Sequence, residues 1–211
     1  MSPLGFHEST VLRLLQEYRV SRRDRIVVLT CKPLVGGVKR AYESLRALCT
    51  TQGFPDPDLV ELECSSFYQS FRAVYSRLLD LDAEEYVLEV GAGLRILGYT
   101  AMLALLRLGR PFKVHYEPEA GSLNPQEIPW EFIEVVIRGL SPSEADILEI
   151  VLGSPGITIG EIASVTGRKE KSVRNIVSQL RKKGLIDKRG RSENLYPTQR
   201  ATALYPEKSR S

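Results

Sequence analysis

This chain of 211 residues has little of what metalloenzymes and membrane proteins need. It contains only two histidines and three widely spaced cysteines, and no pair of cysteines has the short spacing of a metal site. The most apolar predicted helix, residues 94–108, is interrupted by Arg95 and Arg107 and is too short to cross a bilayer. We therefore expect no metal, no cofactor and no membrane span. With so few cysteines, we expect a soluble cytoplasmic protein with buried thiols and no structural disulfide.

Recognisable catalytic motifs are also missing. No Ser/His/Asp set and no pair of carboxylates is apparent in the sequence. The glycine-rich turn Gly91-Ala92-Gly93 is not a dinucleotide-binding fingerprint, because the third glycine of G-x-G-x-x-G would fall at Ile96. An NAD-dependent enzyme is therefore disfavoured, and we expect the chain not to be an enzyme.

What the sequence does have is a strong charge difference between its two ends. Residues 1–138 carry 16 basic and 18 acidic side chains, whereas residues 139–211 carry 13 basic and 8 acidic ones. The overall formal charge of +3 conceals this asymmetry. The basic C-terminal part is the expected binder of a polyanion.

The first part alternates predicted strands and helices. Residues 25–31 form a continuous apolar run, which is typical of a strand buried on both faces. Repeated strand–helix units with short connections predict right-handed crossovers and a largely parallel, Rossmann-like α/β sheet. The further strands are expected at 59–64, 86–90 and 112–116, and the helices at 38–52, 67–81 and 94–108.

The two ends of this first domain are less regular. Residues 8–18 have the apolar spacing of a helix, so a first strand has only residues 1–4 available, and Pro3 removes one backbone donor there. Either that strand is very short or the true start lies upstream of Met1. Residues 117–130 are rich in Pro, Gly and Glu and predict a loop or hairpin. We expect a domain over 1–128, a linker over 129–140 and a second domain over 141–211.

The second domain has the signals of a winged helix-turn-helix. Ser141 and Glu144 form a capping box that begins one helix, and Thr158 and Glu161 form another. Gly167 supplies the sharp turn that this motif needs before the third helix, residues 170–183. Two short strands, 185–188 and 193–196, then predict a wing with basic residues at its tip.

The third helix divides into an apolar face and a polar, basic face. Arginine, asparagine and glutamine can make paired hydrogen bonds to guanine and adenine edges, whereas lysine and serine more often hold phosphates. A protein-binding winged helix is the main competing interpretation. The expected contacts to double-stranded DNA are Arg168, Lys169, Lys171, Ser172, Arg174, Asn175, Gln179, Arg189 and Arg191.

A ligand pocket is expected in the first domain, where the strand order of a doubly wound sheet reverses. Residues 4–8 follow the first strand and residues 91–95 follow the fourth, so these two segments should meet there. Arg95 lies in the first turn of a helix, where the macrodipole disfavours a cation, and an anionic ligand would explain it. An ion pair with Glu89 or Glu117 is the alternative explanation. The candidate ligand residues are Leu4, Gly5, Phe6, His7, Lys32, Gly93, Leu94 and Arg95.

The sequence resembles the archaeal CRISPR-associated transcriptional regulators that combine an N-terminal CARF domain with a C-terminal winged helix. The resemblance covers nearly the whole chain and is carried by Leu4-Gly5-Phe6, by Glu43-Ser44-Leu45-Arg46, by Gly93-Leu94-Arg95 and by the wing architecture. It implies a homodimer that binds cyclic tetra-adenylate across its two-fold axis and regulates CRISPR-Cas genes by binding their promoters. It also implies that Gly5, Phe6, Gly93, Leu94 and Arg95 contact the ligand.

Two other functions remain open from the sequence. Some CARF proteins are ring nucleases that cut cyclic oligoadenylate, and Lys32, His7 and Arg95 would be the candidate helpers here. A DNA-binding protein whose pocket does not respond to any nucleotide is the third possibility. The residues do not decide between activator and repressor, and they do not give the ring size of the nucleotide.

Overall fold

The computed structural model describes residues 1–81, 83–117, 124–189 and 194–205. The chain divides into two compact units, Met1–Ile128 and Pro129–Ser211, each with its own core.

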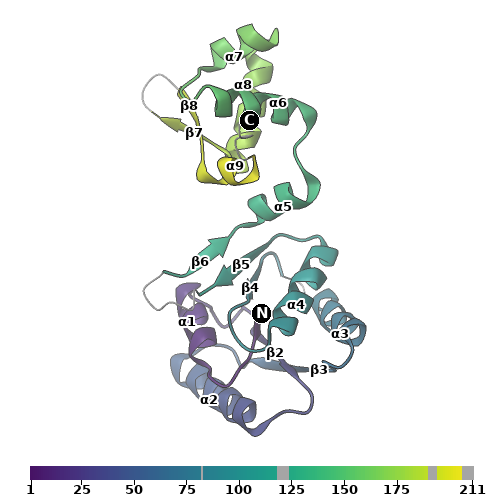
Figure 1. Ribbon diagram of the computed structural model, residues 1–211. Helices are drawn as coiled ribbons and strands as arrows, with labels where there is room; N and C mark the ends of the chain where they lie inside the picture. The colour runs from purple at the N-terminus through teal and green to yellow at the C-terminus, as the bar shows by residue number, and fades with distance from the viewer. Residues whose placement is uncertain (82, 118–123, 190–193, 206–211) are drawn as a thin grey trace, which may run out of the picture. The chain divides into compact units, whose positions relative to one another are not determined.

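Unit 1 contains a parallel sheet that continues into one antiparallel strand (Figure 1). One half has the order β1-β2-β3 and the other has the order β4-β5-β6. Among the described strands of this unit, β6 alone runs antiparallel to its neighbour, so the segment expected as a loop or hairpin contains a strand paired with β5. The strands are β1 (Ser2–Pro3), β2 (Val27–Cys31), β3 (Asp58–Leu62), β4 (Tyr86–Glu89), β5 (Phe112–Tyr116) and β6 (Gln126–Ile128).

The short first strand joins the two halves of the sheet. Ser2 and Pro3 pair in parallel with Val28 and Leu29 of β2. On the other side, the Met1 nitrogen donates to the Val87 carbonyl at 2.7 Å, and the Glu89 amide donates to the Met1 carbonyl at 3.0 Å. The chain therefore runs outward from β1 to β3 on one side and from β4 to β6 on the other. The strand order reverses between β1 and β4, as a doubly wound fold requires.

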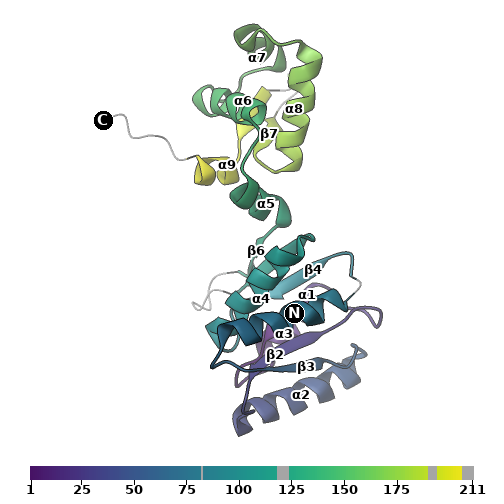
Figure 2. The same cartoon turned by 90° about the vertical axis from the view of Figure 1, so that its right-hand side faces the viewer.

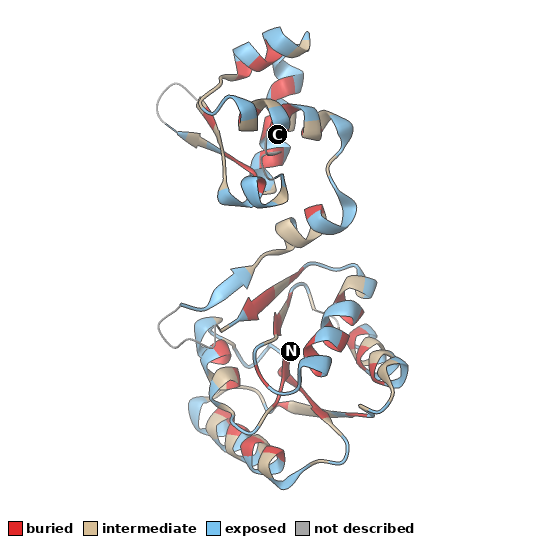
Figure 3. Cartoon of the chain, in the orientation of Figure 1, coloured by how far each residue is buried: buried red, intermediate tan, exposed pale blue. Residues whose placement is uncertain are grey.

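Helices cover both faces of this sheet: α1 (Ser9–Glu17) and α2 (Gly36–Gln52) pack on one face, and α3 (Phe67–Leu79) and α4 (Arg95–Leu108) pack together on the other (Figures 1 and 2). Val11 of α1 and Leu45 of α2 join Val28 of β2 in one buried cluster. The central strands and the sheet-facing sides of the helices are the buried parts of unit 1 (Figure 3). The Rossmann-like prediction is confirmed.

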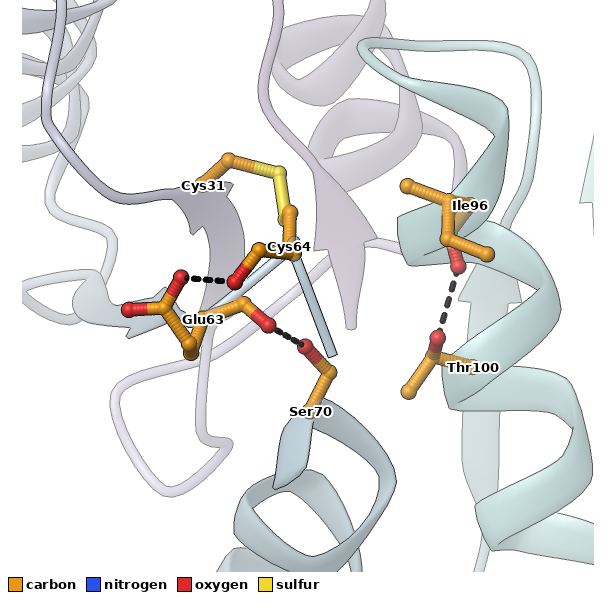
Figure 4. Close-up of a disulfide and its surroundings, with 7 residues drawn as sticks. Cys31, Glu63, Cys64, Ser70, Ile96 and Thr100 are labelled. Carbon is orange, nitrogen blue, oxygen red and sulfur yellow. Dashed lines mark hydrogen bonds between the residues drawn. A yellow bond between two sulfur atoms is a disulfide. The ribbon is translucent and has the colours of Figure 1, made fainter. Parts of the chain in front are cut away.

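One expectation about the cysteines is wrong. Cys31 and Cys64 form a disulfide with their Cα atoms 5.5 Å apart (Figure 4). Only Cys49 is a free, buried thiol. Register explains the pairing, because Cys31 lies opposite Leu62 in the parallel pair β2–β3, and Cys64 comes two residues later. The sequence separation of 33 residues concealed a contact that the sheet creates.

Unit 2 is built from five helices and a two-stranded sheet within the described residues (Figure 1). Its core contains Leu148, Ile162, Val177 and Leu195, which come from three helices and the hairpin. The elements are α5 (Trp130–Arg138), α6 (Pro142–Gly153), α7 (Ile159–Thr166), α8 (Glu170–Lys182), β7 (Ile186–Arg189), β8 (Asn194–Pro197) and α9 (Gln199–Leu204).

Both predicted capping boxes are confirmed. The Ser141 hydroxyl accepts from the Glu144 amide while the Glu144 carboxylate accepts from the Ser141 amide, and Thr158 and Glu161 repeat the arrangement. Helix α9, which begins after Thr198 and buries Ala201, is not predicted from the sequence. The segment expected as a linker contains α5, and Val135 of that helix is buried in the core of unit 2.

Candidate functional site

The two predicted glycine segments of unit 1 meet at the switch point between β1 and β4. A Cβ atom on Gly93 would lie 2.9 Å from the Leu4 carbonyl carbon, and one on Gly5 would lie 3.1 Å from the Gly93 nitrogen. Gly93 also has a φ of +64°, which a side chain would strain. Both glycines are therefore needed for this close backbone contact. The contact places the start of α4 directly beside the end of β1.

Glu89 holds the glycine turn in this position. Its side chain is fully buried at the end of β4, where it accepts hydrogen bonds from the Ser2 hydroxyl at 2.9 Å and from the Gly91 and Ala92 amides. Burial raises the pKa of the Glu89 carboxyl, and the hydrogen bonds from Ser2, Gly91 and Ala92 oppose that shift. Two amides that could have faced an anionic ligand are thus already occupied. This role of Glu89 is not predicted in the sequence analysis above, although an acid two residues before a glycine turn is a usable signal.

Arg95 has no neutralising partner among the described residues. Of the two carboxylates that could have paired with it, Glu89 binds the glycine turn and Glu117 forms an ion pair with Arg13 of α1. Arg95 is exposed in the first turn of α4 and lines a cavity of about 310 Å³ together with Tyr99 and Tyr116. A free guanidinium beside two phenol rings is a suitable contact for a phosphate and a stacked base.

A second cavity, of about 510 Å³, lies on the β1 side of the glycine contact. Phe6 and His7 line it, and so does Arg40 of α2, which is not among the candidate ligand residues. The remaining candidates are placed differently. Leu4 has its side chain buried in the core, Leu94 is exposed at the N-cap of α4, and the exposed Lys32 lines neither of these two cavities.

Helix α8 of unit 2 presents the predicted polar face to solvent. Val173, Val177 and Leu180 are buried against the core, so the opposite side of the helix is left free. The turn before α8 runs from Gly167, whose φ of +67° ends α7. The exposed residues at or beside the start of α8 and along its outer side are Lys169, Lys171, Ser172, Arg174, Asn175 and Gln179.

Two other basic residues of this region have partners within unit 2. Arg168 pairs with Asp146 of α6 at 3.1 Å. Lys183, directly after α8, donates to the Glu144 carboxylate at 2.7 Å. Burial would raise the pKa of Glu144, but the hydrogen bonds from Lys183 and Ser141 lower it below its ordinary value. Charge composition alone could not separate these paired cations from the free ones.

In the wing, the basic residue Arg189 packs over an aromatic ring. The Arg189 guanidinium lies 5.2 Å from the ring centre of Tyr196 across the β7–β8 pair, which fixes its direction. Arg191, also expected to contact DNA, falls outside the described residues.

Metal-binding clusters and membrane-spanning helices are both missing from the described ranges. These ranges contain no group of three or more His, Cys, Asp or Glu side chains placed to hold a metal ion. No helix within them combines the length and the apolar character that crossing a bilayer requires.

A Rossmann-like domain followed by a winged helix of the MarR type is the class of protein that these two units define. The family model for the Csa3 CRISPR-associated Rossmann-like domain matches residues 1–131, and the model for the MarR family matches residues 138–194. The chain belongs to the Csa3 family. The CRISPR locus-related protein Csa3 of Saccharolobus solfataricus is 26% identical over 192 residues, which cover 91% of this chain and 81% of that protein.

Two solved structures are more distantly similar. Protein VC1899 from Vibrio cholerae is 16% identical with a TM-score of 0.46, over 96% of this chain and 63% of that one. Can2 from Sulfobacillus thermosulfidooxidans, solved with cyclic tetra-adenylate, is 13% identical with a TM-score of 0.45, over 97% and 60%. The chain therefore spans less than two thirds of either structure. Both TM-scores lie below 0.5, so neither likeness bears on the site.

Proposed function

We propose that this protein is a DNA-binding transcriptional regulator of CRISPR-Cas genes whose affinity for DNA responds to cyclic tetra-adenylate. The observation that carries the DNA-binding half is the exposed face of α8, where Lys171, Arg174 and Asn175 are free while the buried face holds the core. A helix of this kind places its outer side chains in the major groove. The name of the Saccharolobus relative also proposes DNA binding for that protein.

The ligand-binding half rests on Arg95 and on the glycine contact. Arg95 has no ion-pair partner among the described residues, and the contact between Gly5 and Gly93 places the start of its helix beside the end of β1. The family resemblance implies that cyclic oligoadenylate binds at this position. Its phosphates are the anionic partners that the guanidinium of Arg95 does not find within the described residues. We propose that two copies of unit 1 share one ring, each giving one Arg95.

The test of this function is a pair of titrations on the full-length protein. Cyclic tetra-adenylate is titrated calorimetrically into the wild type and Arg95→Ala, with Arg110→Ala as a control that removes the same charge beyond the far end of α4. We expect about one ring per two chains for the wild type and the control, and a loss of affinity of tenfold or more for Arg95→Ala. Absence of binding by well-folded wild type would contradict the sensor half.

DNA binding is tested on DNA fragments that carry the promoters nearest to the gene of this protein. Arg174→Ala is expected to lose specific binding but keep the nucleotide, whereas the control Arg138→Ala on α5 is expected to keep both. The wild-type affinity for the fragment should change when the ring is added, because a ligand shifts an equilibrium only through its differential affinity for the two states. The ring should also be recovered intact by mass spectrometry. Linear products would instead support the ring-nuclease alternative.

A further inference from the structure

The connection between α1 and β2 carries a dense cluster of positive charge. We call residues 19–25 the arginine loop, because four of its seven residues are arginine and only one is acidic. The five charged residues are all exposed: Arg19, Arg22, Arg23, Asp24 and Arg25. Residues 1–138 as a whole carry more acidic than basic side chains, so the loop is a local positive surface on a part of the chain with the opposite sign.

The acidic residue of the loop binds the loop itself and fixes its shape. The Asp24 carboxylate accepts hydrogen bonds from the Ser21 amide at 2.7 Å and from the Ser21 hydroxyl at 2.8 Å. Val20 and Ile26, near the two ends of the loop, pack in the buried cluster that contains Val28. The arginines are therefore presented from a fixed backbone, which reduces the entropy that is lost when a partner binds.

The carboxylates on the neighbouring connection already have other partners. The Asp58 amide donates to the Ile26 carbonyl at 2.8 Å, so the start of β3 lies beside the end of the loop. The Asp58 carboxylate pairs with Arg77 of α3, and Asp56 pairs with Arg46 of α2 at 2.9 Å. Within the part of the chain that the structure describes, no ion pair involves an arginine of the loop. All four are therefore available to an anion from another molecule.

Arg19 occupies a backbone position that normally belongs to glycine. Its φ is +49°, and no other residue except glycine has a positive φ in the described ranges. Its amide and that of Val20 bond to carbonyls three and five residues earlier, and Gly53 after α2 and Gly184 after α8 begin the same pair of hydrogen bonds. A side chain is disfavoured in this left-handed conformation. An arginine that is retained there indicates a use for its charge.

The side chains of the loop fit the phosphates of a nucleic acid duplex. Every basic residue in it is an arginine, whose planar guanidinium can bind a phosphate through two parallel hydrogen bonds. The loop contains no aromatic side chain on which an unpaired base could stack. These features favour the backbone of a double helix over a single strand, and they favour binding that does not depend on base sequence.

We propose that the arginine loop is a second DNA contact of this protein, which binds phosphates of a duplex without reading its sequence. This inference rests on the proposed function, because unit 2 brings the duplex to the same chain and so raises its effective concentration at the loop. The loop precedes β2, whereas the glycine contact follows β1, so the two lie at opposite edges of this parallel sheet. The loop can therefore bind DNA while the pocket holds its ligand.

The test uses full-length protein and a fluorescent duplex that carries the promoter nearest to its gene, with affinity measured by anisotropy at several salt concentrations. We expect Arg22→Gln/Arg23→Gln to weaken binding about tenfold at low salt and to reduce the slope of log affinity against log salt concentration by about two. Arg19→Gly should reduce this slope by about one without lowering the unfolding temperature, because glycine favours the left-handed conformation. The matched control Arg72→Gln removes an exposed charge of α3 that also lacks an ion pair in the described residues, and it should change neither quantity.

A second readout detects contact at the loop directly. Phenylglyoxal modifies accessible arginines, and peptide mass spectrometry gives the rate of modification at each one. Bound duplex should slow the modification of the loop severalfold and leave the rate at Arg72 unchanged. Equal rates at the loop with and without DNA would overturn the proposed contact.

The outcomes separate this contact from the proposed function. If the wild type binds the duplex and Arg174→Ala loses specific binding, while the loop variants keep the salt slope and an affinity within twofold of the wild type, the loop contact is overturned and the proposed function stands. If the loop variants lose affinity for a single-stranded RNA of equal length but not for the duplex, the partner is RNA and the proposal is overturned. If well-folded wild type binds no DNA, both are overturned.

Discussion

The two units assemble their candidate surfaces in opposite ways. In unit 2, the exposed basic residues follow one another along a single helix, and the local periodicity of α8 separates Arg174 from the buried Val173. In unit 1, Gly5 and Gly93 come from two separate segments and come into contact only because β1 lies between β2 and β4. A surface whose residues are close in sequence can be predicted from the sequence. A surface formed by distant segments can be predicted only if the strand order and register of the whole sheet are predicted correctly.

Reducing the Cys31–Cys64 disulfide should give the largest difference in stability between the two units, because this bond lies in unit 1. Closing a loop of 33 residues stabilises a fold by about 3–4 kcal/mol in the chain-entropy description. We expect a reductant to speed amide hydrogen exchange throughout unit 1 and to leave unit 2 unchanged, as measured by mass spectrometry. The variant with serine at both positions 31 and 64 should show the faster exchange without reductant and no further response to it. Equal exchange with and without reductant would contradict the disulfide's stabilising role.

Removing the Glu144 carboxylate should have the converse effect and destabilise unit 2 alone. Glu144→Gln deprives Lys183 of its partner, and we expect a loss of about 1–2 kcal/mol in urea unfolding. The fluorescence of Trp130, the single tryptophan, reports this unfolding because α5 belongs to unit 2. The matched control is Glu161→Gln, which alters the same kind of capping box without a lysine and should change stability less.

The comparison of wild type with Glu144→Gln also gives a pH dependence with a definite sign. The pKa of Glu144 is lowered in the folded state, so its stabilising contribution is complete at neutral pH and is lost as the pH falls through that lowered value. We expect the stability difference between wild type and Glu144→Gln to shrink on acidification below the ordinary carboxylate range. A stability difference that grows in acid would show that the ion pair between Glu144 and Lys183 does not stabilise unit 2.

Substitutions of base-contacting and of phosphate-contacting residues in α8 should have different effects on DNA affinity and sequence preference. Arg174→Ala is expected to cost about 1–3 kcal/mol in specific DNA binding and to relax the sequence preference at one position. Competition titrations against single-base variants of the bound fragment measure this. A uniform loss across all sequences would show that Arg174 contacts the backbone instead.

The smallest expected effect is that of Lys169→Gln, at the N-cap of α8. We expect a modest, sequence-independent loss of DNA affinity and a reduction of about one in the slope of log affinity against log salt concentration. Arg168→Gln should change this slope less, because Arg168 already pairs with Asp146. A larger change for Arg168 than for Lys169 would reverse the assignment.

The sequence predicted regular elements well and relations between distant elements poorly. Both capping boxes, the α8 face and most strands were found, because each depends on residues within a few positions of one another. The meeting of the Gly5 and Gly93 segments was also anticipated, since the strand order of a doubly wound sheet dictates it. The Cys31–Cys64 bond was missed because it depends on the register of β2 against β3.

The same distinction applies to the functional residues. Arg40 lines the cavity beside Phe6 but is not predicted as a ligand residue, because a basic residue on an amphipathic helix is usually solvated surface. Glu89 was considered as a partner for Arg95, and its buried bonds to the glycine turn depend on β1 lying beside β4. Conversely, Lys183 is one of the basic residues of the C-terminal part, but it binds a carboxylate of its own domain.

Glu144 also gives unit 2 a short mechanical linkage. One of its carboxylate oxygens binds the amide and hydroxyl of Ser141, where α6 begins, and the other binds Lys183, where α8 ends. The start of α6 and the end of α8 are therefore joined through the side chains of Glu144 and Lys183, in addition to the contacts of the hydrophobic core.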